Sequence, residues 1–204
     1  MCEGLIALGL SVDVRSRPGV ERARAVLEEL LATAEESGDI YFIYAAHDNL
    51  CPYGFFYDDP GAVRLHVDRL GVMAEEFGVS RVWEDLRRGE LLYAEGNYAG
   101  ALETHRSTFA SARRRDFPSG MADAARGAAS CLLALRDDEE GAARLYGFAA
   151  QQLRSSGFGE RYEGNRWADA DMDVLRARLG DRLAFLLAEG AAMTREEITE
   201  MLVA

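Results

Sequence analysis

The chain of 204 residues is long enough to bury the core of one domain or of one continuous array of repeats. Only three residues are cysteines, Cys2, Cys51 and Cys131, and this odd number without a CxxC spacing argues against a disulfide scaffold and against a zinc site. The formal charge of -12 at pH 7 would repel a phosphate backbone, so we expect no direct binding of nucleic acid.

The sequence also lacks the features of exported and membrane-bound proteins. No segment reaches the roughly 18 consecutive apolar residues that a membrane span requires, and the N-terminus lacks the basic-then-apolar order of a signal peptide. We therefore expect a cytoplasmic protein without a membrane partner. Lysine is absent and all 23 basic residues are arginine, which excludes chemistry that needs a Schiff-base lysine or the lysine of a phosphate-binding loop.

Helix-forming residues dominate the whole chain. Ala, Leu, Glu and Arg recur throughout, only four prolines occur, and no stretch shows the sustained period-2 alternation of a half-buried strand. These features predict an all-α protein. The first expected helix, residues 4–12, is too short to be a full member of a helix pair, which indicates that the chain begins inside a repeat.

A repeat of about 40 residues organises the helices that follow. Small residues spaced 39, 39 and 41 apart mark it, each near a helix start: Ala23, Ala62, Ala101 and Ala142. Two helices approach closely only where a side chain is no larger than a methyl group, so we expect these alanines at helix crossings. Helix-stop signals follow each of these helices, at Gly38, Gly78, Pro118 and Gly157.

Between these stops we expect second helices at residues 39–50, 79–95 and 119–136. Helix pairs with this period predict an α-solenoid of tetratricopeptide-like antiparallel helix pairs, wound into a right-handed superhelix. The repeats are expected over residues 1–160. C-terminal capping helices of the same domain are expected over residues 161–204, at about 161–179, 181–190 and 194–203.

The aromatic-rich segment 49–60 interrupts what should be a short turn. Pro52 removes a backbone donor, so one interpretation is a helix that kinks or ends there and leaves the following aromatic residues exposed as a docking patch. The repeat register after Pro60 favours the other interpretation, a helix that continues to about residue 57 with a local distortion.

Residues 89–101 carry the small and large residues of the tetratricopeptide signature at its spacing: Gly89, Leu92, Gly96, Tyr98 and Ala101. The units are longer than that repeat, and they resemble the C-terminal helical repeats of large bacterial signal-transduction ATPases, which include LuxR-type transcriptional regulators. The most specific stretches are AARLYG at residues 142–147 and the segment 179–194, which contains LGD, AEG and MT. The resemblance covers about residues 19–204 and is strong from about residue 139.

This resemblance implies a sensor or partner-docking arm of a transcriptional regulator. In that family the repeats follow a nucleotide-binding ATPase, and a DNA-binding domain usually lies at one end of the polypeptide. The chain has neither a phosphate-binding loop nor a helix-turn-helix, so those activities are not carried over. We expect a fragment of a longer regulator, with an intact short homologue as the alternative. The expected partner is a protein or peptide, such as the ATPase portion of the same regulator.

The inner wall of the superhelix is the expected binding surface. The first helix of each pair lines it, and Tyr and Trp offer large rigid contact areas with a polar tip. The residues that the signature places there are Tyr44, His47, Cys51, Trp83, Leu86, Arg87, Glu90 and Tyr93. For Tyr44 and Trp83, packing between neighbouring repeats is an equally good explanation.

No catalytic or metal-binding group is expected. His47 and Cys51 lie four residues apart on one predicted helix, but no second pair of ligands follows them. The three histidines fall on three predicted helices, and His66 and His105 lie one repeat apart, which favours surface or packing roles. We therefore expect a protein without enzymatic activity, cofactor or metal.

Two charged runs have structural explanations. Asp169, Asp171 and Asp173 alternate like the first ligands of a calcium loop, but the glycine and glutamate that complete such a loop are missing, so we expect a solvated helix face. The arginines at residues 113–115 end a helix, where cations interact well with the negative end of the helix dipole. Phosphate binding is the alternative for them.

Three hypotheses of function follow from the sequence. The leading one is the docking of a protein or peptide on the inner wall. The second is a sensor in which a small-molecule inducer binds that wall and shifts the array between two states. The third is a symmetric homodimer through residues 1–35, whose apolar surface a truncated first repeat would leave uncovered.

Overall fold

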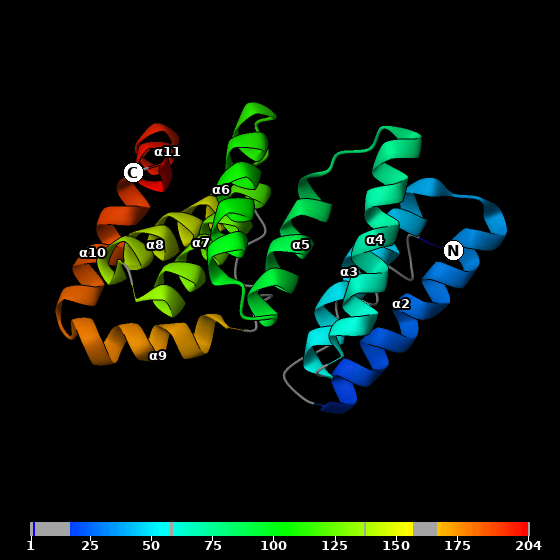
Figure 1. Cartoon of the computed structure of the whole chain (residues 1–204), viewed down its shortest axis with the longest axis horizontal. Helices are drawn as coiled ribbons and strands as arrows, with labels where there is room; N and C mark the ends of the chain where they lie inside the picture. Colours follow the sequence, from blue (N-terminus) through cyan, green and yellow to red (C-terminus); the bar gives the residue numbers. More distant parts are fainter. Residues whose placement is uncertain (1, 3–16, 58, 137, 157–166, 204) are drawn as a thin grey trace. The chain divides into compact units, whose positions relative to one another are not determined.

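The computed structural model describes residues 2, 17–57, 59–136, 138–156 and 167–203. These residues form ten helices and no strand, so the prediction of an all-α protein is confirmed for them (Figure 1). The helices are α2 (Arg17–Ser37), α3 (Ile40–Phe56), α4 (Pro60–Phe77), α5 (Val82–Ala94), α6 (Tyr98–Arg114), α7 (Pro118–Leu135), α8 (Glu139–Ser155), α9 (Ala168–Leu179), α10 (Arg182–Ala192) and α11 (Arg195–Val203). The predicted helix at residues 4–12 and the first residues of the predicted cap, 161–166, lie outside the described residues.

The chain divides into two compact units, residues 1–87 and residues 88–204. In the first unit, α2 packs on α3 and α3 packs on α4. A cluster of buried residues joins α2 to α3 and consists of Leu27, Leu30, Ala46 and Leu50. Four partly buried residues pack against this cluster: Cys2, Leu31, Phe42 and Tyr53. Consecutive helices of this unit thus bury apolar side chains against one another.

In the second unit, α6, α7 and α8 pack on one another in sequence order. The helices that follow return to these three: α10 packs along α8, α9 contacts α7, α8 and α10, and α11 contacts α6. The predicted border between repeats and capping helices, at residues 160/161, falls inside this unit.

Helix ends follow local signals that the sequence shows. Gly38 and Gly78 have φ angles of 71° and 66°, the left-handed conformation that favours glycine after a last helical turn. Asp39 and Asp59 begin the next helices, because their carboxylates accept hydrogen bonds from the amides of Phe42 and Ala62. The helix stops expected at Gly38 and Gly78 are confirmed.

Pro52 lies inside α3, which continues to Phe56. A helix end at residue 50 was therefore wrong, and the interpretation of a helix continuing to about residue 57 is confirmed. Proline supplies no amide for the helical bond to the carbonyl of Asp48. One position away, the thiol of Cys51 donates to the carbonyl oxygen of His47 at 3.3 Å, so its sulfur stays against its own helix.

The repeated alanines are packing positions in three of four cases. Ala23, Ala101 and Ala142 are fully buried, whereas Ala62 near the start of α4 is half-buried. A methyl group suffices where helices meet, which explains why the repeat keeps this residue small. Ala62 instead borders a groove between α2, α3 and α4.

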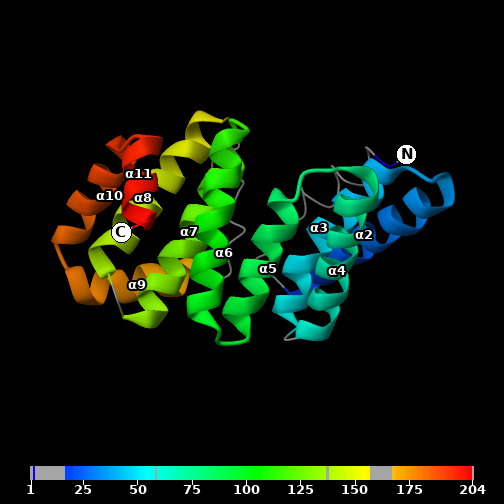
Figure 2. The ribbon, with the colours of Figure 1, turned by 45° about the horizontal axis from the view of Figure 1, so that its top comes forward.

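Helices α8 and α10 cross closely and lie side by side in Figures 1 and 2. A Cβ atom added to Gly147 would lie 2.1 Å from the carbonyl oxygen of Leu187, and one added to Gly190 would lie 2.0 Å from that of Arg144. Both glycines fall in the segments that carry the family resemblance. Backbone touches backbone here, so neither position tolerates a side chain.

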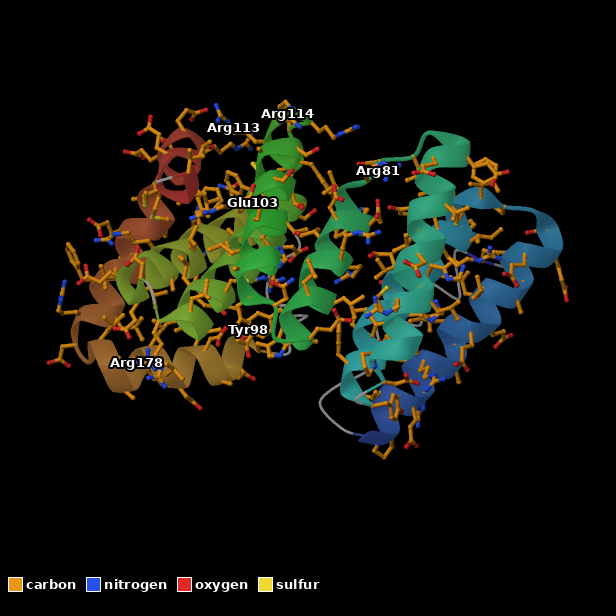
Figure 3. All side chains as sticks on the ribbon, in the orientation of Figure 1. Arg81, Tyr98, Glu103, Arg113, Arg114 and Arg178 are labelled. Atoms are coloured by element: carbon orange, nitrogen blue, oxygen red, sulfur yellow. The ribbon has the colours of Figure 1, made fainter. Side chains whose placement is uncertain are left out.

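Ion pairs hold the C-terminal helices in the second unit. Arg113 at the end of α6 donates to Glu196 and Thr199 of α11, both at 3.0 Å (Figure 3). Two further pairs reach α8: Arg178 of α9 with Glu139 at 2.5 Å, and Arg182 of α10 with Glu140 at 2.6 Å. The first arginine of the run 113–115 is thus engaged with α11, in addition to its place at the helix end.

Within the described residues, no helix combines the length and the apolar character that crossing a bilayer requires.

Candidate docking groove

The predicted inner-wall residues of the first unit are largely occupied by contacts within it. The hydroxyl of Tyr44 donates to the carbonyl oxygen of Ser80 at 2.9 Å, and burial raises the pKa of this phenol. Leu86 is 1% exposed and belongs to the core, while Trp83 is half-buried. Leu86 therefore offers no surface to a partner.

Arg87 forms a buried ion pair. Its Nε lies 2.8 Å from Oδ1 of Asp48 on α3, and the two side chains are 10% and 11% exposed. The partners are 39 residues apart, which is the repeat spacing. Because its charge is paired with Asp48, Arg87 links α5 to α3.

His47 lies against His66, with 2.9 Å between their Nδ1 atoms. Burial, the neighbouring His66 and the charge of Arg69 lower the pKa of His47 to about 4, and burial with the charge of Arg24 lowers that of His66. A hydrogen bond at this distance needs one Nδ1 to donate and the other to accept, and the lowered pKa values favour the neutral form of both rings. Sequence spacing paired His47 with Cys51, but among the described residues no three His, Cys, Asp or Glu side chains are placed to hold a metal ion.

Glu90 and Tyr93, the predicted wall residues of the second unit, border a polar cavity of about 10 Å³. This is room for about one water molecule. The ring of Tyr93 lies 5.0 Å from that of Tyr98 and 4.8 Å from that of Trp167, so aromatic packing covers one side. The cavity is too small for a peptide side chain or an inducer.

His105 borders the same cavity, and its ring is held between two glycines. A Cβ atom on Gly89 of α5 would lie 2.6 Å from Cε1 of this ring, and one on Gly127 of α7 would lie 2.3 Å from it. The side chain is 2% exposed, and burial lowers its pKa to about 4. Among the described residues its Nδ1 has no hydrogen-bond partner. The packing role expected for His105 agrees with this position.

Asp171 was predicted on a solvated helix face, and for this residue the prediction was wrong. It is 8% exposed, and its Oδ2 accepts hydrogen bonds from Tyr146 at 2.5 Å and Ser130 at 2.6 Å. The two hydroxyl oxygens lie 3.1 Å apart. The network joins α7, α8 and α9 through one buried side chain.

A groove of about 190 Å³ lies between α2, α3 and α4 of the first unit, and we call it the α2–α4 groove. From α2 it is lined by Arg24, Glu28, Leu31, Ala32 and Glu35. From α3 and its C-cap it is lined by Leu50, Tyr53, Gly54 and Tyr57. From the start of α4 it is lined by Asp59, Ala62 and His66.

The floor of this groove is apolar and aromatic. Leu50 is 4% exposed, Leu31 and Tyr53 pack on the α2–α3 cluster, and burial raises the pKa of Tyr53. Tyr53 and Tyr57 come from the segment 49–60, whose crowded aromatics indicated a docking patch in the sequence. Both tyrosines are half-buried and border the groove, whereas Phe55 of the same segment is 5% exposed and belongs to the core.

The rim of the groove is acidic. Glu28, Glu35 and Asp59 stand against a single arginine, Arg24, whose Nε lies 2.7 Å from Oε1 of Glu28. The guanidinium carbon of Arg24 lies 5.3 Å from the centre of the Tyr57 ring, within the range of a cation–π contact. The sequence placed the α2 residues only within a possible dimer surface, residues 1–35, and Asp59 only within the segment 49–60. It did not predict that they line one groove.

No protein-family model and no curated protein sequence matches the chain.

Proposed function

We propose that this chain is a non-enzymatic docking module that holds a segment of a partner protein in the α2–α4 groove. The carrying observation is the groove itself, which combines an apolar, aromatic floor with an acidic rim. Such a combination of a buried anchor pocket and a charged border is typical of protein recognition sites.

The proposed scaffold is a tetratricopeptide-like α-solenoid with a right-handed superhelix, as the period near 40 predicts. Ordered packing of neighbouring helices in each unit supports it. On the family resemblance, we further propose that the chain is the C-terminal part of a bacterial, cytoplasmic transcriptional regulator. The ATPase portion of that regulator is then a candidate partner.

Volume favours a peptide side chain over a larger inducer. Pockets for drug-sized ligands measure about 300–1,000 Å³, whereas a cavity of about 150 Å³ accommodates benzene. At about 190 Å³ the α2–α4 groove fits one large side chain. A small-molecule sensor is the alternative function, and it would require a ligand no larger than a single ring system.

The experiment is a selection of peptides from a phage-displayed random library on the purified protein. NMR chemical-shift changes of the protein amides then locate the bound peptides. We expect them to map to α2, α3 and α4, and to lose at least tenfold in affinity when Ala32 on the exposed groove edge becomes Trp and fills it. Ala177→Trp, at an exposed position of α9, is the matched control.

Peptides that map elsewhere, or that bind A32W and wild type equally, would contradict the proposal. A thermal-shift screen of nucleotides and sugars runs beside the selection. A small molecule that raises the melting temperature of wild type and not of A32W would establish the sensor function instead.

A further inference from the structure

We infer that the α2–α4 groove recognises a cationic side chain, an arginine in particular, next to an apolar anchor, and that Arg24 is an internal competitor which occupies the cation position until the partner replaces it. The inference rests on the proposed docking function and adds the chemistry of the partner to it.

The groove already holds one guanidinium. Arg24 contacts the Glu28 carboxylate at 2.7 Å and the face of Tyr57 at 5.3 Å, which are the two contacts that a foreign arginine would need. An arginine of the partner fits the same place because its planar group both stacks on a ring and bonds a carboxylate.

One arginine leaves the groove with excess negative charge. Glu35 is exposed on the same edge and has no ion-pair partner among the described residues, while Asp59 uses its carboxylate to cap α4. The surrounding unit has the same sign: residues 1–87 include 16 acidic residues and 8 arginines out of the chain totals of 35 and 23. A basic segment is therefore attracted to this unit before contact.

The internal cation is weakly held. The side chains of Arg24 and Glu28 are 47% and 52% exposed, and an exposed pair four residues apart on a helix contributes little to stability. A partner arginine that also anchors an apolar side chain on the groove floor gains from both contacts. Replacement of Arg24 is then favourable without any change in the helices.

The direct test is an NMR titration with a blocked, alanine-rich helical peptide that carries one tryptophan and an arginine one turn later. Its control has citrulline, a neutral group of the same shape, in place of arginine. We expect wild-type protein to bind the arginine peptide about two- to fivefold more tightly than the citrulline peptide, as a solvent-exposed charge contact allows.

Three variants locate the cation position. Arg24→Gln removes the arginine that occupies it, and we expect about a twofold gain in affinity for the arginine peptide, which is what one exposed ion pair four residues apart on a helix is worth. Glu35→Gln weakens binding of that peptide by a similar factor and leaves the citrulline peptide unaffected. Arg22→Gln is the matched control, since Arg22 is an exposed arginine of α2 outside the groove lining.

Failure of this inference is distinguishable from failure of the docking function. Equal binding of the two peptides to α2–α4, or weaker binding of the arginine peptide to R24Q, would overturn the cation inference and leave docking in place. If neither peptide shifts the amides of the groove, both the inference and the docking function at this groove are overturned.

Discussion

The Nε atom of Arg87 donates to Oδ1 of Asp48 across 2.8 Å in a part of the first unit where both side chains are about nine-tenths buried. Two charges removed from water in this way depend on each other, because a lone buried charge keeps its desolvation penalty without compensation. The net attraction of the pair contributes little to the free energy of unfolding, but loss of one partner would be strongly destabilising. The pair holds α3 against α5 for this second reason.

Arg87→Ala should lower the free energy of unfolding by about 3–5 kcal/mol, since it leaves the buried carboxylate of Asp48 without its arginine partner. The double variant Asp48→Leu with Arg87→Met, which removes both charges and keeps apolar volume, should lose much less. Urea unfolding followed by circular dichroism measures both. A double variant less stable than R87A would contradict this account.

The stability of the second unit should depend on pH through His105. Its pKa is lowered by burial to about 4, from an ordinary value of 6.5. The unfolded chain takes up this proton first, so the free energy of unfolding falls as the pH is lowered from 6.5 toward 4, by about 3 kcal/mol, and is unaffected above 6.5.

The matched variant is His105→Phe, which keeps a ring between the two glycines. It should remove this part of the pH dependence, although His47 retains its own contribution over a similar range. Denaturation at several pH values compares the two proteins, and NMR follows the ring protons of His105. An ordinary pKa for His105 in the folded protein would refute the prediction.

Gly147→Ala should be severely destabilising. The added methyl would lie 2.1 Å from a carbonyl oxygen of α10, and backbone atoms of two packed helices cannot retreat as a flexible side chain does. We expect a loss of about 3 kcal/mol or separation of α10 from α8.

Gly61→Ala in the first turn of α4 is the control for that exchange. Its methyl would meet only the Asp59 carboxylate, at 3.3 Å, so the change should be neutral or stabilise by up to about 1 kcal/mol. Thermal unfolding compares the melting temperatures of the two variants. Similar melting temperatures would show that the α8–α10 crossing has room for a methyl group.

Asp171 and Asp173 lie two residues apart on α9 and should respond differently to substitution. Asp171→Ala leaves the hydroxyls of Tyr146 and Ser130 without their shared acceptor in a buried place, at a loss of about 2–4 kcal/mol. The side chain of Asp173 is 78% exposed, so Asp173→Ala should change stability by less than about 0.5 kcal/mol. Guanidinium unfolding measures both, and equal losses would contradict the role of the network.

Local features of the fold were predictable from the sequence and long-range ones were not. Gly38 and Gly78 end helices because the left-handed conformation favours glycine, a signal confined to one residue. Asp171 was misassigned because its partners lie 25 and 41 residues away on other helices, and nothing in the neighbouring acidic residues distinguishes it.

At the candidate site too, local features could be predicted from the sequence and contacts between helices could not. The aromatic segment 49–60 could be identified as unusual, and Tyr53 and Tyr57 do border the groove. Arg24 and Glu28 have the spacing of an ordinary surface pair on a helix, so their place in a groove appears only when α2, α3 and α4 are brought together. The contact between His47 and His66 likewise needs the packing of α3 on α4.

Cys51 of the first unit and Cys131 of the second are both fully buried, and burial raises the pKa of Cys131 to about 12. A thiol in this state reacts with an alkylating reagent only after the surrounding helices open. With the half-buried Cys2 changed to Ser, each unit carries one buried cysteine, and the rate at which that cysteine is alkylated reports how often the unit opens. Mass spectrometry of the labelled cysteines then times the two halves separately, and matching rates would mean that they open as one.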